Sequence, residues 1–107
     1  MNDDATISIV ISANHPALTG HFPGKPVVPA VVMLDAVLAQ IRTHGDFVLR
    51  SIPATKFLQP VLPEERVELH LQFDTIDAAQ LRVGFRGLRA DALVFEGSFI
   101  VSAGSGP

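Results

Sequence analysis

One nearly continuous apolar segment, residues 27–41, constrains the fold of this chain more than any other feature. Pro29 suits the first position of a helix, where its missing N–H costs nothing, and Gly45 is typical of the position just past a helix end. The only polar side chains within the apolar segment are Asp35 and Gln40. A helix that is apolar nearly all round is normally buried. We therefore predict one long buried helix that begins at Pro29 and ends before Gly45.

The remainder of the chain is patterned as strands. The clearest is residues 66–74, in which apolar residues at every second position would face the core while His70 faces solvent. Residues 47–51 and 54–58 form two short candidates separated by Pro53, which cannot donate to a sheet. Further strands are expected at residues 6–12, 80–86 and 92–101. This order gives an α+β fold, and a curved sheet paired edge to edge with a second subunit would cover both the helix and the sheet edges.

Composition points to one small domain, residues 1–107. The chain is 48% hydrophobic and 18% charged, which allows both a core and an apolar surface for self-association. The absence of cysteine excludes a disulfide scaffold, thiolate catalysis and a cysteine zinc site. A net charge of −3 without a Lys/Arg cluster disfavours nucleic acid as a partner, and no apolar run is long enough to span a bilayer. With no basic leader at the start, a cytoplasmic location is expected.

Asp35 is the first candidate for chemistry. An ionised carboxylate in an apolar setting is costly unless it finds a partner or keeps its proton. Asp35 is therefore a candidate general acid. The alternative is a structural carboxylate that accepts a hydrogen bond from a neighbouring donor and so fixes the helix.

A Gly/Pro-rich loop carrying His21 precedes the helix. Pro23 and Pro26 withhold hydrogen-bond donors and Gly24 allows unusual backbone angles, so this segment cannot continue a helix or a central strand. Such a stiff segment suits a side chain that must be held still, and an imidazole changes charge near neutral pH, as a base requires. A lone histidine is nevertheless more often structural. His15 has no third ligand placed to complete a metal site with His21, so we expect it on a loop surface.

Two stretches of the sequence resemble one enzyme family. GHFPG, followed by PVVP, an apolar helix and an acid at position 35, is similar to the active-site segment of the 3-hydroxyacyl-[acyl-carrier-protein] dehydratases. KFLQPVLPEERVELHLQF resembles the next strand, turn and strand of that family. An aspartate as the acid resembles the 3-hydroxydecanoyl branch, because the commoner branch has glutamate. The resemblance implies the hotdog fold, an antiparallel sheet wrapped around one long buried helix, and a dimer with two sites at the subunit interface.

The same resemblance implies an activity and its residues. The reaction would be dehydration of a 3-hydroxyacyl thioester in fatty-acid or polyene-type lipid biosynthesis. His21 would remove the C2 proton, and Asp35 of the facing subunit would protonate the departing C3 hydroxyl. The amides around Ala30 and Val31 would stabilise charge on the thioester oxygen. The candidate substrate-binding residues are Phe22, Gly24, Lys25, Ala30 and Val31. The candidate tunnel walls are Val28, Val31, Val32 and Leu34, which ordinary core packing explains at least as well.

The implied partners follow from this substrate. An acyl carrier protein would deliver the thioester, and the expected assembly is a homodimer, with a higher oligomer or a heterodimer as the alternative. Lys25 is either a solvated surface lysine or a contact to a phosphopantetheine phosphate or an acidic carrier protein. No metal or redox cofactor is expected, because the pantetheine arm arrives with the substrate.

Two departures from the family pattern leave other functions open. The family usually has glycine after the proline at the helix start, and Ala30 in its place narrows the approach to the thioester. It usually has glutamine four residues after the acid, where this chain has Ala39 with Gln40 following, and the extra position turns the amide by about 100°. These departures favour a non-catalytic partner subunit of a dehydratase heterodimer as an alternative, while the His21/Asp35 pair argues against it. A thioesterase on the same fold, using a carboxylate and water, is a separate alternative.

Overall fold

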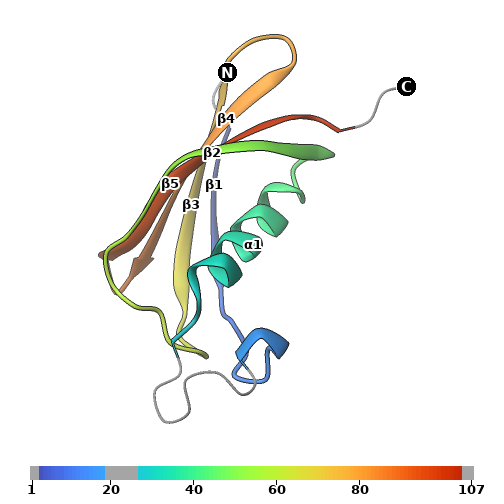
Figure 1. Ribbon diagram of the computed structural model, residues 1–107. Coiled ribbons are helices and arrows are strands. Elements are labelled where there is room, and N and C mark those ends of the chain that lie inside the picture. The colour runs from blue at the N-terminus through green and yellow to red at the C-terminus, as the bar shows by residue number, and fades with distance from the viewer. Residues whose placement is uncertain (1–2, 19–26, 105–107) are drawn as a thin grey trace.

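The computed structural model describes residues 3–18 and 27–104, which form a single antiparallel sheet beside one long helix (Figure 1). The strands are β1 (Asp3–Ile9), β2 (Phe47–Phe57), β3 (Val67–Thr75), β4 (Gln80–Arg89) and β5 (Ala92–Ala103). The helices are the 3₁₀ turn η1 (Pro16–Leu18) and α1 (Ala30–Ile41). The strand order is β1-β3-β4-β5-β2, so β1 and β2 are the two edges. The predicted α+β class is confirmed.

Helix α1 begins one residue later than the sequence predicts and also ends earlier. Pro29 is the N-cap in an extended conformation, and Ala30 is the first helical residue. The last helical residue is Ile41, and the chain then tightens into a turn in which the His44 N–H donates to the Ile41 carbonyl at 3.0 Å. Such shorter-range bonds satisfy carbonyls at a helix end. Gly45 therefore follows this turn, not the helix itself.

The core lies between α1 and one face of the sheet (Figure 1). Strand β3 alternates as predicted, with apolar side chains buried at every second position. The aromatic centre of the core is formed by Phe85, whose ring centroid lies 5.0 Å from that of Phe99 and 6.1 Å from that of Phe95. The helix contributes its buried side chains Val32, Met33, Val37, Leu38 and Ile41.

The side of α1 away from the sheet is open in the single chain. Val31 is 64% exposed, and Asp35 and Ala39, one and two turns further along, are exposed as well. Gln40 is half-buried and lies off this stripe, as its extra position predicts. The prediction of a helix buried all round is therefore wrong for one copy of the chain, because one sheet covers only one side of a helix.

Strand β2 is a single strand, which corrects the prediction of two. Pro53 is tolerated within it because β2 is an edge, where one side of the strand needs no sheet partner. The pairing of β2 with β5 shifts register between Leu49 and Ser51 and again between Ser51 and Ala54. Strand β1 also differs from the predicted range, since it spans Asp3–Ile9 and not residues 6–12.

The loop between β2 and β3 is bonded to the chain that follows β1. The Glu64 N–H donates to the Ile11 carbonyl at 2.8 Å, and the Glu64 carboxylate accepts the Ala13 N–H at 2.6 Å. Glu64 has a φ of 68°, a left-handed conformation that costs a non-glycine residue energy. These two hydrogen bonds offset part of that cost.

Candidate functional site

A cleft of about 540 Å³ opens beside the first turn of α1. On the helix side it is lined by residues 27–30 and Met33, and on the sheet side by residues 57–61, which run from the end of β2 into the following loop. Almost all of these side chains are apolar. The cleft therefore suits an apolar ligand.

The first turn of α1, next to this cleft, carries backbone hydrogen-bond donors. The Pro29 carbonyl accepts the N–H groups of Val32 at 3.0 Å and Met33 at 3.2 Å, and no side chain among residues 3–18 and 27–104 caps the helix. Within the described residues, the amides of Ala30 and Val31 have no acceptor. Free amides at the positive end of a helix stabilise negative charge on a nearby atom. The arrangement can thus hold an oxygen on which charge develops.

Backbone hydrogen bonds hold the two walls together. The Val28 N–H donates to the Val61 carbonyl at 2.8 Å, which joins the residue before Pro29 to the loop after β2. The Leu58 N–H donates to the Val94 carbonyl at 2.8 Å, which joins the same loop to β5. The cleft is therefore built on backbone geometry and does not depend on side-chain contacts alone.

The predicted site residues separate into three groups. Val28 and Ala30 line the cleft. Val31, Val32 and Leu34 do not, because Val31 faces solvent while the other two pack on or toward the core. The third group lies outside the described residues, so its roles stay predictions: His21, Phe22, Gly24 and Lys25.

Asp35 lies away from the cleft of its own chain. It is two residues beyond Met33, which corresponds to a rotation of about 200° around the helix, and it is exposed. It forms no hydrogen bond or ion pair with any residue that the structure describes. One copy of the chain thus places Asp35 on the opposite side of α1 from the wall that contains Met33.

His15 has a structural position. Its Nδ1 accepts the Ala17 N–H at 3.0 Å, which caps the short η1 turn. Among residues 3–18 and 27–104, no three His, Cys, Asp or Glu side chains come together as metal ligands. The same residues include no helix with both the length and the apolar character that crossing a bilayer requires.

Sequence reasoning missed the wall formed by residues 57–61. The sequence places residues 57 and 58 at the end of a predicted strand and gives residues 57–61 no site role. The stretch KFLQPVLPEERVELHLQF contained the signal, because it resembles the dehydratase family over this turn. The hydrogen bond from Val28 to Val61 explains why this turn belongs to the site.

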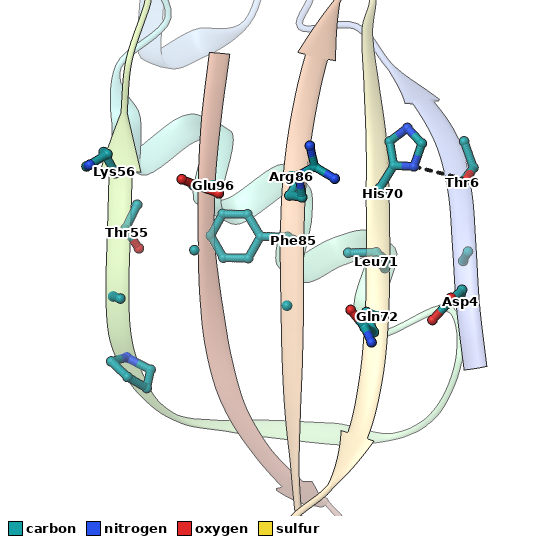
Figure 2. A pocket seen from close by; sticks show the side chains of 15 residues that line it. Asp4, Thr6, Thr55, Lys56, His70, Leu71, Gln72, Phe85, Arg86 and Glu96 are labelled. Atoms are coloured by element: carbon teal, nitrogen blue, oxygen red, sulfur yellow. Dashed lines mark hydrogen bonds between the residues drawn. The ribbon is translucent and has the colours of Figure 1, made fainter. Parts of the chain in front are cut away.

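A larger hollow, about 920 Å³, lies on the other face of the sheet (Figure 2). A polar row crosses the five strands there, through the register partners Thr6, His70, Arg86, Glu96 and Lys56. These residues alternate with the core-facing ones, so they point away from α1. His70 accordingly faces outward, 3.4 Å from the Glu68 carboxylate, and its side chain is 41% exposed. None of the predicted site residues that the structure describes lines this hollow.

Three comparisons relate the chain to known proteins. A sequence model of the family described as "ApeI-like: ApeI dehydratase" matches residues 1–98. The 3-hydroxyacyl-[acyl-carrier-protein] dehydratase FabZ of Haemophilus influenzae is 39% identical over 72 residues, which cover 58% of this chain and 49% of that protein. The chain thus spans about half the length of the curated relatives it matches.

Solved structures show the fold. A chain of the dehydratase heterocomplex ApeI:P from Xenorhabdus doucetiae has a TM-score of 0.74 and 21% identity, over 95% of this chain and 94% of that chain. The (R)-hydratase from A. caviae involved in PHA biosynthesis has a TM-score of 0.73 and 14% identity, over 95% of both chains. The predicted hotdog fold is confirmed.

Proposed function

Since the chain belongs to the ApeI-like dehydratase family, we propose that it converts a 3-hydroxyacyl thioester carried by an acyl carrier protein to the trans-2-enoyl thioester. The observation that supports this most directly is the apolar cleft beside the first turn of α1, which Ala30 lines and where the amides of Ala30 and Val31 have no acceptor among the described residues. A thioester needs both parts: room for its chain and donors for its oxygen. The whole of residues 1–107 would form the one domain that does this work.

The proposed reaction uses two side chains and these amides. His21 takes the C2 proton, and the electron pair moves toward the thioester carbonyl, whose oxygen accepts hydrogen bonds from the Ala30 and Val31 amides. The C3–O bond then breaks, and Asp35 gives its proton to the departing hydroxyl, which leaves as water. His21 finishes protonated and Asp35 ionised, so the pair is restored by one proton transfer between them through solvent.

A second copy of the chain would complete each site. Asp35 faces away from its own cleft, whereas residues 21–26 lead directly into Val27 at the cleft wall. The side of α1 that carries Asp35 also exposes Val31, a large apolar side chain that a second subunit would cover. We therefore place His21 and Asp35 of one site on different subunits of a homodimer. A heterodimer with a related chain is the alternative assembly.

The remaining predicted residues would hold the substrate. The Gly24 amide and the Phe22 side chain would orient the thioester, and Lys25 would contact the phosphopantetheine phosphate or the acidic surface of the carrier protein. The Ala30 methyl group would narrow the approach to the helix amides. This would restrict the thioesters that fit, in comparison with a glycine at the same position.

A panel of 3-hydroxyacyl carrier-protein thioesters, analysed by mass spectrometry for loss of water, tests the proposal. We expect dehydration by the wild type, and a loss of about 100-fold or more in His21→Ala and in Asp35→Asn. Asp46→Asn, an exposed carboxylate just past α1, is the matched control and should keep full activity. Release of free carrier-protein thiol, surviving in His21→Ala but not in Asp35→Asn, would instead identify a thioesterase. No reaction with any thioester would leave the non-catalytic partner as the better function.

A further inference from the structure

Arg89, the last residue of β4, holds the loop that forms one wall of the cleft. Its Nη1 donates to the Pro60 carbonyl at 2.9 Å and to the Glu65 carboxylate at 2.8 Å. Its Nη2 donates to the Gln59 side-chain carbonyl at 2.9 Å. Gln59 and Pro60 line the cleft, and Arg89 does not. One guanidinium therefore joins the two ends of a loop from outside the site.

Glu65 extends this clamp. The Oε1 atom that accepts from Arg89 also accepts the Leu62 N–H at 2.8 Å, so the loop is bonded on both sides of Val61. The Arg89 and Glu65 side chains are 28% and 30% exposed, and water screens the attraction between their charges. A lysine at this position would lack the planar group with several donors that lets arginine bond to three acceptors at once.

The loop transmits this restraint to the other wall. The Val61 carbonyl, next to Pro60, accepts the Val28 N–H at 2.8 Å, and Val28 is followed by the N-cap of α1. Arg89 thus acts on the distance between the two walls through two links: the guanidinium to Pro60, then Val61 to Val28. Removal of the first link leaves residues 59 and 60 without their side-chain restraint, while the loop keeps its bonds to β5, to Val28 and, through Glu64, to the chain after β1.

We propose that Arg89 is a positioning residue that sets the width of the cleft by clamping residues 59–62 against the chain leading into α1. This inference rests on the proposed function, because the cleft is assigned to the thioester substrate. A looser wall weakens binding of the ground state and the transition state alike. Loss of the clamp should therefore raise KM and leave kcat nearly unchanged. His21 and Asp35 are untouched by the change.

Arg89→Met is the test variant, because it keeps most of the side-chain length and removes all the donors. We expect KM for the preferred thioester to rise about tenfold, the size expected for loss of a hydrogen bond to a charged group, with kcat changed less than about threefold. Arg89→Lys retains a single donor nitrogen, so its KM should lie between those of the wild type and Arg89→Met. Arg86→Met is the matched control, on the same strand, exposed and without a hydrogen bond to any described residue, and should behave as the wild type.

Hydrogen exchange of the Val28 amide separates this inference from the proposed function. In the substrate-free protein, Arg89→Met should speed that exchange about tenfold, while Arg86→Met leaves it unchanged. If the Val28 amide of Arg89→Met exchanges at the wild-type rate, or if KM is unchanged, the proposal that Arg89 clamps the loop is wrong. An inactive wild type overturns the proposed function, and the exchange result then still decides the clamp. If Arg89→Met does not fold, the same two measurements on Arg89→Lys decide it.

Discussion

Two inactive variants should restore each other's activity if the site is shared between subunits. In a homodimer of His21→Ala every site lacks its base, and in a homodimer of Asp35→Asn every site lacks its acid. A mixed dimer has one site without either group and one site with both. This follows from the direction of Asp35, which leaves α1 on the side opposite the cleft wall that contains Met33.

The expected recovery can be worked out from the two-fold symmetry. Equal amounts of the two variants exchange into dimers in the ratio 1:2:1, so about half of the dimers are mixed, and each has one complete site of two. The mixture should therefore reach about a quarter of wild-type activity. A purified mixed dimer, selected with two different tags, should reach about half.

The assay is thioester dehydration by mass spectrometry, with native mass spectrometry to confirm that subunits have exchanged. A second mixture, of wild type with the double variant His21→Ala/Asp35→Asn, distinguishes sites shared between subunits from sites within one subunit. If each site draws on two subunits, the mixed dimers there are inactive, and activity falls to about a quarter of an all-wild-type sample; sites within one subunit would leave about half. Exchanged variants that stay at background, or a protein that is only monomeric in solution, refute the shared site.

Three further perturbations follow from the structure. Ala30→Gly should raise kcat/KM for straight-chain thioesters about tenfold by opening the approach to the helix amides, at a cost of about 1 kcal/mol in unfolding free energy; unchanged kinetics would show that the methyl group is not an obstacle. Ala39→Arg, on the exposed stripe, should change the stability of the single chain by less than about 0.5 kcal/mol yet abolish dimers in light scattering; an intact dimer would place the interface elsewhere. Ala90→Asn with Asp91→Gly should raise the unfolding free energy by about 1 kcal/mol, because φ at these residues is 50° and 68°; a denaturant titration without a gain would contradict this.

Local sequence rules predicted the elements whose causes are local. Pro29 marks the start of α1 because its ring excludes it from later positions, and the alternation in β3 identifies the buried face. The two β2 candidates were separated because a proline interrupts a central strand. Whether Pro53 lies in a central or an edge strand depends on the order of strands, which no local pattern contains.

The candidate site was only partly predictable for a related reason. The apolar pattern of α1 shows that the helix will be covered, but it does not distinguish cover by its own sheet from cover by another subunit, and Val31 and Asp35 fall on the uncovered side. Residues 57–61 line the cleft, and Arg89 bonds to them from outside it, through contacts between distant parts of the chain. Spacing along the sequence has no information about such contacts unless a family resemblance supplies it.

The turn at Glu64 has a consequence for the two segments on either side of the stretch 19–26. The chain leading into that stretch is tied to Glu64 through Ile11 and Ala13, and the chain leaving it is tied to Val61 through Val28. The four residues 61–64 therefore hold the segment after β1 and the segment before α1. A change in the length of residues 61–64 would therefore move these two segments together while every strand kept its neighbours.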